Sequence, residues 1–149
     1  EEPIHPAFTH ILEQLAADEA RVLRLLATTG DQPAITVRDR GSLPLSSSVV
    51  AGKITMIGIN AGVSDKERMP VYLDNLERLG LLAFSTDSVD DLKQYQVLEA
   101  QPDVEAAVET ASWVKLVRHS VSLTAFGREF CDVCLPTDGG GPETDDTEQ

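Results

Sequence analysis

Residues 66–84, Lys-Glu-Arg-Met-Pro-Val-Tyr-Leu-Asp-Asn-Leu-Glu-Arg-Leu-Gly-Leu-Leu-Ala-Phe, decide the fold. Over 66–79 the apolar side chains recur every three or four positions, which predicts a helix with one apolar face. They are Met69, Tyr72, Leu73, Leu76 and Leu79. Pro70 falls within about the first turn, where its missing N–H matters little. Gly80 follows the last apolar residue, as is common just past a helix, and 81–84 predicts a strand leaving it.

Two more helices are predicted near the N-terminus. Pro6 suits the first turn of a helix over 6–15, and a second helix over 17–29 ends before Gly30. Each has apolar residues at helical spacing, and the expected core faces are Phe8, Ile11, Leu12 and Leu15 in the first and Val22, Leu23, Leu26 and Ala27 in the second.

The segments between residue 30 and the deciding helix carry weaker signals. Residues 33–37, Pro-Ala-Ile-Thr-Val, predict a short strand. Residues 39–48 contain glycine, proline and four serines, which is typical of a loop. Residues 49–63 fit either a strand or a short helix, because short apolar runs do not distinguish the two.

The C-terminal third predicts a helix, a strand and a closing helix. After residues 92–99, Pro102 precedes apolar residues at helical spacing, namely Val104, Ala107, Val108 and Ala111. Residues 113–123 are rich in Val and Leu and predict a strand. Thr124 is a good N-cap for a last helix over 124–134 whose face is Phe126, Phe130, Val133 and Cys134.

This order of elements predicts an α+β fold, in the form of a predominantly helical, winged-helix-like domain with a small antiparallel sheet. Residues 1–135 form that domain. Residues 136–149 contain three consecutive glycines and five acidic residues, with no basic residue. Such a segment cannot bury enough apolar surface to fold, so we expect it to be a disordered acidic tail.

Charge and composition limit the classes of function. The chain has 149 residues and a formal net charge of −13, and the part before the tail is acidic as well. An acidic balance argues against broad contact with nucleic-acid phosphates or anionic lipid. No apolar run approaches the roughly 20 residues needed to cross a bilayer, and no signal peptide is evident. Two cysteines are too few for a secreted disulfide framework, so the expected location is the cytoplasm.

Four motifs, taken in order, resemble the abortive-infection alpha family of bacteria. They are His5-Pro6-Ala7-Phe8, residues 15–20 (Leu-Ala-Ala-Asp-Glu-Ala), residues 72–81 and residues 123–130 (Leu-Thr-Ala-Phe-Gly-Arg-Glu-Phe). Together they span most of residues 5–135, and the last two are the most specific. Ala16 and Ala17 stand where family members often have Ser-Pro, which forfeits an N-cap hydrogen bond. The resemblance implies a setting in phage resistance and brings no enzymatic activity or cofactor.

We expect no catalytic, cofactor-binding or metal-binding residues, and therefore no enzyme. Cys131 and Cys134 form a lone CxxC, whereas a structural zinc site needs four ligands. His5, His10 and His119 are scattered along the chain, so neither a metal pair nor a catalytic triad can be argued. The carboxylates of Asp18, Glu19, Asp74 and Glu77 are expected on the solvent faces of their helices.

The predicted function is therefore that of a non-catalytic interaction or regulatory domain of a phage-defence protein. Its partner would be another protein or a second copy of itself, and no membrane contact is evident. The alternative is a winged-helix DNA-binding domain. In that case Lys115, Arg118 and Arg128, which have no acid between them, would contact the duplex backbone. The net charge disfavours this alternative.

Overall fold

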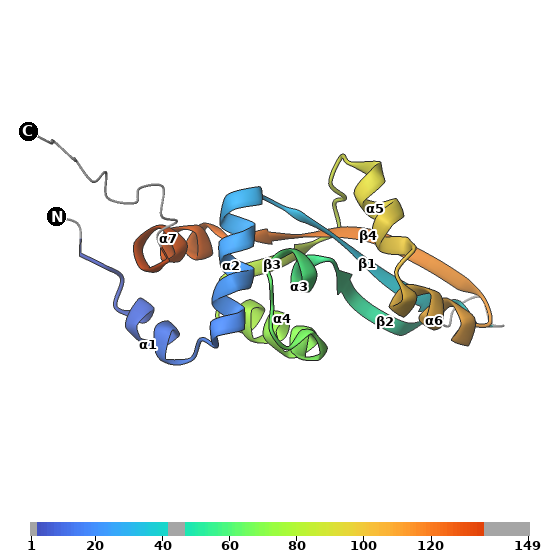
Figure 1. Cartoon of the computed structure of the whole chain (residues 1–149), viewed down its shortest axis with the longest axis horizontal. Coiled ribbons are helices and arrows are strands. Elements are labelled where there is room, and N and C mark those ends of the chain that lie inside the picture. Colours follow the sequence, from blue (N-terminus) through green and yellow to red (C-terminus); the bar gives the residue numbers. More distant parts are fainter. Residues whose placement is uncertain (1–2, 42–46, 136–149) are drawn as a thin grey trace, which may run out of the picture.

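The computed structural model describes residues 3–41 and 47–135. Its four strands form one antiparallel sheet in the order β2-β1-β4-β3, and long strands run from a helical body to a distal tip (Figure 1). The helices and strands are, in chain order, α1 (Ala7–Glu13), α2 (Ala17–Thr29), β1 (Gln32–Asp39), β2 (Ser48–Thr55), α3 (Ile57–Asn60), the short 3-10 helix η1 (Lys66–Arg68), α4 (Met69–Arg78), β3 (Leu82–Ser85), α5 (Leu92–Glu99), α6 (Pro102–Thr110), β4 (Val114–Leu123) and α7 (Ala125–Cys134).

The α+β class predicted from the sequence is confirmed, and most predicted elements are found within a residue or two. The ambiguous stretch 49–63 contains both alternatives, because the chain pairs with β1 as far as Thr55 and then turns into α3, whose Ile57 is fully buried. The segment 92–99 is helical. The predicted tail, residues 136–149, and residues 42–46 of the predicted loop lie outside the described residues.

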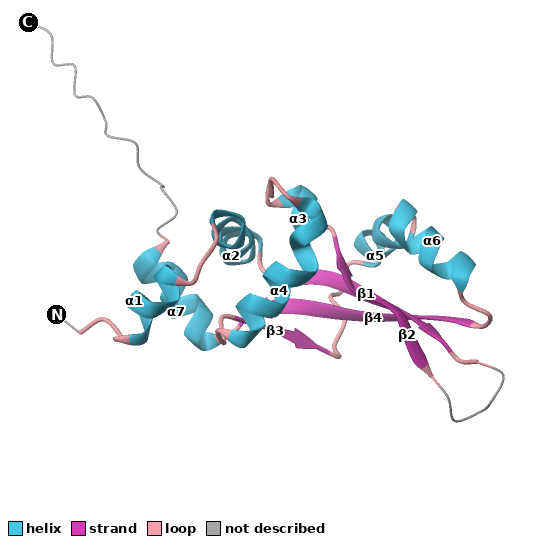
Figure 2. Ribbon diagram, turned by 90° about the horizontal axis from the view of Figure 1, so that it is seen from below, coloured by secondary structure: helices cyan, strands magenta, loops and turns pink. Residues whose placement is uncertain are grey.

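Two hydrophobic clusters cover opposite faces of the sheet at its two ends. The larger one joins α1, α2, α4 and α7 to the near end of the sheet and includes Phe8, Leu23 and Leu76. The smaller one packs α5 and α6 on the distal half, against Ile35 and Val37 of β1. In Figure 2, α5 and α6 lie on one side of the distal sheet, and the described chain places no helix on its other side.

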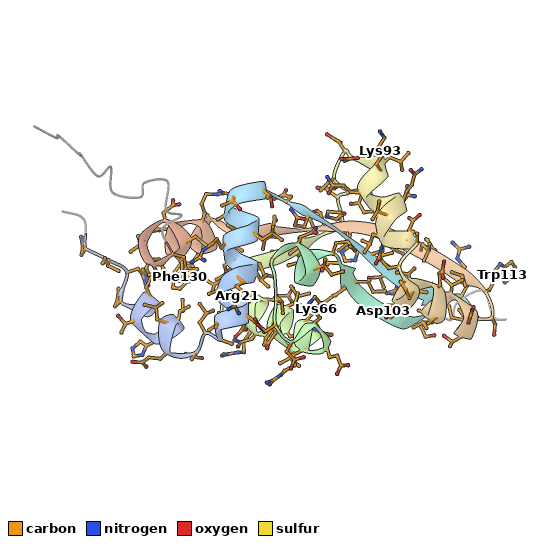
Figure 3. All side chains as sticks on the ribbon, viewed as in Figure 1. Arg21, Lys66, Lys93, Asp103, Trp113 and Phe130 are labelled. Atoms are coloured by element: carbon orange, nitrogen blue, oxygen red, sulfur yellow. The ribbon has the colours of Figure 1, made fainter. Side chains whose placement is uncertain are left out.

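The two ends of the molecule therefore differ in character. Phe130 of α7 faces the helical body and is fully buried, whereas Trp113 lies at the opposite tip of the sheet and is 68% exposed (Figure 3). Within the described residues, none of the helices is both long and apolar enough to span a membrane.

The start of α7 is locked onto the end of the deciding segment 66–84. Gly80 ends α4 with φ +75, a left-handed conformation that other residues rarely adopt. Thr124 donates its N–H to the Leu81 carbonyl (3.1 Å), and its hydroxyl accepts the Gly127 N–H (2.9 Å) as the N-cap of α7. Gly127 lies so close to the residue before β3 that a Cβ there would be 1.8 Å from the Leu81 carbonyl oxygen.

The substitution Gly127→Ala therefore tests this close approach, because the packing determines whether it raises or lowers the free energy of unfolding. In an open helix, replacing glycine with alanine stabilises by about 1 kcal/mol. Here the new methyl group would meet backbone, which cannot move without separating α7 from β3, so we expect a loss of about 2 kcal/mol or more in the free energy of unfolding. Urea denaturation followed by circular dichroism measures it. A variant as stable as the wild type or more stable would contradict the packing.

Candidate functional site

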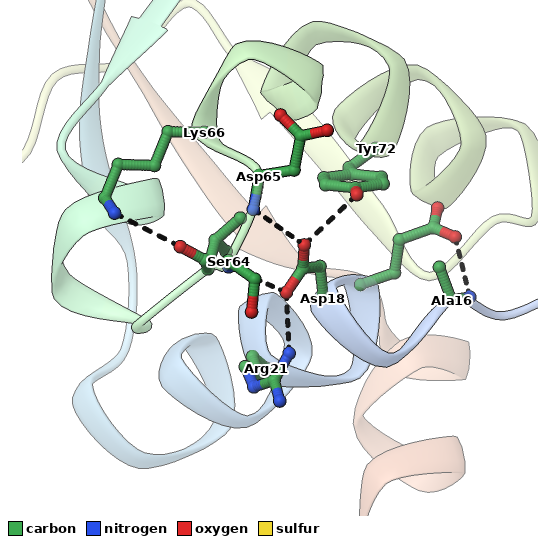
Figure 4. A network of polar contacts seen from close by, with 9 residues as sticks. Ala16, Asp18, Arg21, Ser64, Asp65, Lys66 and Tyr72 are labelled. Carbon is green, nitrogen blue, oxygen red and sulfur yellow. Dashed lines mark hydrogen bonds and ion pairs between the residues drawn. The ribbon is translucent and has the colours of Figure 1, made fainter.

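A buried carboxylate network ties α2 to the start of α4 (Figure 4). The Asp18 Oδ1 accepts hydrogen bonds from the Ser64 N–H (2.9 Å) and from Arg21 Nη1 (2.6 Å). Its Oδ2 accepts the Asp65 N–H and the Tyr72 hydroxyl, both at 3.1 Å. The hydrogen bond from Ser64 is the largest cause that lowers the pKa of Asp18 to about 2, although burial opposes the shift. The ionised carboxylate thus holds the turn before α4 against α2.

A second network at the same junction uses the polar side chains of α4. Glu19 accepts the Ala16 N–H (2.9 Å) and the Asn75 amide (2.8 Å). Arg78 Nη2 donates to Gln14 Oε1 (2.9 Å) and to Asn75 Oδ1 (2.7 Å). Asn75 and Arg78, which a DNA-reading helix would direct at base edges, are therefore bound to side chains of the protein itself.

The expectation that Asp18 and Glu19 face solvent is wrong, because the two residues are only 7% and 3% exposed. Both lie in the first turn of α2, where an acid is favoured by the helix dipole and can accept backbone N–H groups. Asp74 is exposed, as expected, but it accepts a hydrogen bond from Lys53 of β2 at 2.8 Å. The residue Glu77 also lies close to Lys53, at 3.6 Å.

A groove of about 420 Å³ runs beside β2. One wall is β2 itself, from Ala51 to Thr55, and the other walls come from α3, η1, the start of α4 and Asp103 of α6. The outer edge of β2 is not paired in the described sheet. Ile59 lines the groove and is 55% exposed. The groove thus combines a strand edge that is unpaired among the described residues with an exposed apolar side chain.

Lys53 marks a bulge in β2 next to this groove. The β1–β2 register shifts between Ile35 and Val37, and Lys53 adopts φ +54, which is uncommon for a residue other than glycine. Its ammonium group lies 4.7 Å from the centre of the Phe84 ring, in addition to the contacts with α4. The hydrogen bond to Asp74 is the main cause that raises the pKa of Lys53.

The distal half of the sheet has one open face, on the side opposite α5 and α6. A cavity of about 240 Å³ there is lined by Thr36, Arg38, Phe84, Val117 and His119, among others. Thr36 Oγ1 and His119 Nε2 are 3.0 Å apart, and the His119 and Phe84 rings lie 5.8 Å apart. Burial lowers the pKa of His119, which favours its neutral form. Sequence reasoning missed this cluster, because it forms between strands far apart in the chain.

The three cations proposed for DNA contact are not brought together. Lys115 and Arg118 lie three residues apart on β4, so strand alternation puts them on opposite faces. Arg118 is bound to Glu99 of α5 by two hydrogen bonds (2.7 and 3.2 Å) and lies 5.4 Å from the Tyr95 ring. Arg128 is on α7 at the far end of the molecule (Figure 1). The alternation of the predicted strand 113–123 could have revealed this separation.

The cysteines and the remaining histidines are spread over the helical body. Cys131 is buried, and burial raises the pKa of its thiol to about 11, so the thiol stays protonated near neutral pH. His5 packs against the rings of Phe8 and Phe126, and His10 is exposed near Glu13. Over the described residues, no group of three or more potential metal ligands is found.

The fold and these surfaces define an α+β domain in which a twisted antiparallel sheet extends from a helical body. The model of the family described as abortive infection alpha matches residues 1–134. The chain belongs to that family, and the resemblance seen in the sequence is confirmed.

A solved structure supports the fold. It is that of an uncharacterized protein from the hydrocarbon-degrading marine bacterium Alcanivorax borkumensis SK2, with a TM-score of 0.60 and 23% sequence identity. The match covers 89% of this chain and 97% of the other. At this identity the likeness shows the fold alone. No curated protein matches the chain.

Asp18→Asn tests whether the ionised carboxylate holds the α2–α4 junction. Because the pKa of Asp18 is lowered from 3.8 to about 2, its ionisation stabilises the folded state above about pH 4, and that contribution is lost as the pH falls toward 2. We expect the variant to melt at a lower temperature than the wild type near neutral pH, and the difference to shrink in acid. Asp90→Asn, at an exposed loop position, is the matched control. A difference independent of pH would contradict a role for the charge.

Proposed function

We propose that this domain is a non-catalytic interaction and regulatory module of a bacterial phage-defence protein that acts in the cytoplasm. Membership of the abortive infection alpha family supports the defence setting. The observation that carries the interaction role is the groove beside β2, where a strand edge that is unpaired in the described sheet lies next to the exposed side chain of Ile59. Exposed apolar side chains beside free backbone groups are a common basis for recognising polypeptide segments.

In this proposal, an extended segment of the partner lies along β2. Its main chain would pair with the edge of the strand, and these hydrogen bonds would give affinity. Its apolar side chains would enter the groove, and these contacts would give specificity. The bulge at Lys53 limits how far such pairing can extend, because bulges twist an edge away from a regular ladder. This favours a short, defined segment over open-ended sheet growth. The partner is a second copy of the chain or a phage component.

We also propose that the domain derives from a winged helix. The strand order β1-β4-β3 and the sequence α2, β1, α3, α4, β3, β4 are typical of that fold, and β2, α5 and α6 are additions to it. In a DNA-binding winged helix, α4 would enter the major groove. Here its Asn75 and Arg78 are engaged by Gln14 and Glu19, which favours protein interaction over duplex recognition.

The interaction role can be tested by placing a charge on the groove. Ile59→Asp should abolish binding there, because partner burial would leave the new carboxylate without hydrogen-bond partners. Leu92→Asp is the matched control, since Leu92 is similarly exposed (53%) but lies on α5. In a phage plating assay with the natural full-length protein, the groove variant should lose protection and the control should retain it.

Sedimentation analysis of the same variants identifies the class of partner. Concentration-dependent dimers that the groove variant cannot form would assign the groove to self-association, whereas a monomeric wild type would assign it to a phage component. Protection by the groove variant equal to that of the wild type would contradict the proposal in either form.

A further inference from the structure

The open face of the sheet carries a row of cations and rings that the groove does not use. Along β1 and β4, Thr36 faces Val117 and Arg38 faces Lys115 in the ladder. The ladder continues for one more pair, because Arg40 donates its N–H to the Trp113 carbonyl at 2.9 Å. At the inner end of the row lie His119 and Phe84. We call this row, from Phe84 and His119 to Trp113, the ribbon strip.

The pairing of Arg38 with Lys115 is unfavourable for the free protein. Like charges directly opposite each other on neighbouring strands repel, and proteins usually avoid them. Arg38 donates to the Ser47 hydroxyl at 3.0 Å, and within residues 3–41 and 47–135 neither Arg38 nor Lys115 is in an ion pair. This arrangement contrasts with Arg118 on the other face, which Glu99 neutralises. An anion bound between the two cations would remove their repulsion.

The nearby carboxylate of Asp39 does not neutralise the row. Its two oxygens accept backbone N–H groups from Gly41, Ser112 and Trp113 at 2.9 to 3.1 Å. These hydrogen bonds, led by that from Gly41, lower the pKa of Asp39, so its charge is already satisfied by the backbone of the tip. Asp39 thereby fixes the backbone that carries Trp113.

Rings stand at both ends of the row of cations. Trp113 projects from the tip and is 68% exposed, an unusual exposure for the largest side chain (Figure 3). At the inner end, the neighbouring His119 and Phe84 rings line the cavity of about 240 Å³. Six residues of β-strand separate Trp113 from His119, a span of about 20 Å. That length suits a few nucleotides of an extended chain.

We propose that the ribbon strip binds single-stranded nucleic acid, with phosphates on Arg38, Arg40 and Lys115 and bases against Trp113 and the Phe84–His119 pair. Cations that follow a backbone, together with rings that stack on bases, are the means by which sheets and barrels bind single strands without strong sequence preference. An acidic peptide would use the cations but leave the rings without a partner of matching shape. This inference goes beyond the proposed function and uses a different surface.

The chain contains one tryptophan, so Trp113 reports directly on binding. The purified protein is titrated with unlabelled oligonucleotides of about 8 residues, within the range of known single-strand sites. Single-stranded RNA or DNA should quench Trp113 fluorescence, and either or both would support the proposal. With three phosphates neutralised, the logarithm of the association constant should fall with the logarithm of salt concentration with a slope of about −2.

Variants distinguish binding at the ribbon strip from a general electrostatic attraction to the protein. Arg38→Ala with Lys115→Ala should weaken binding about tenfold or more and make the slope about 1.4 less negative. Lys93→Ala with Arg128→Ala removes the same charge from α5 and α7 and should bind like the wild type. Phe84→Leu, which keeps an apolar side chain, should weaken binding by about fivefold or more through lost stacking. Circular dichroism confirms that each variant is folded.

Four results would overturn the proposal. They are an unchanged Trp113 signal even at low salt, equal quenching by polyglutamate of similar length, equal or tighter binding of duplex DNA, and an equal loss of binding in the Lys93 and Arg128 control. The polyglutamate result would assign the strip to an acidic peptide, and the duplex result would restore the winged-helix alternative.

Discussion

The carboxylate of Asp18 is the interaction on which the arrangement of the helical body depends. It accepts two backbone N–H groups from the turn before α4, as well as the Tyr72 hydroxyl and the Arg21 guanidinium. A buried charge is costly unless it is fully hydrogen-bonded, so this group is satisfied in only one arrangement of α2, the turn and α4. Once α4 is placed, β3 follows from Gly80, and α7 packs on Leu81 through Gly127.

That constraint determines which parts of the molecule remain available for recognition. Two polar side chains of α4, Asn75 and Arg78, are hydrogen-bonded to Glu19 and Gln14. Its two acidic side chains, Asp74 and Glu77, form ion pairs with Lys53. The helical body therefore acts as a support. The sheet extends from it with a free edge along β2 and an open face across β1 and β4. The two surfaces differ in chemistry, because an exposed apolar side chain, Ile59, lies beside the strand edge in the groove and the open face carries cations and rings.

The sequence was a good guide to the elements and a poor guide to the surfaces. Helical spacing and stop signals predicted α1, α2, α4 and α7 closely, because their apolar faces are local patterns. Residues 49–63 could not be assigned, since the strand there is defined by pairing with β1 and not by its own composition. Asp18 and Glu19 were misplaced for a similar reason, because their partners lie about 50 residues away in the chain.

The central claim is that the Asp18 carboxylate anchors the turn before α4 and makes the helical body a rigid support. Amide hydrogen exchange near neutral pH tests it most directly, because it reports on individual backbone N–H groups. We expect slow exchange at Ser64 and Asp65 in the wild type, and fast exchange at these two residues in Asp18→Asn while the amides of β1 and β4 stay protected. Exchange at Ser64 and Asp65 as fast as in the exposed loop after β3, in the wild type itself, would contradict the account.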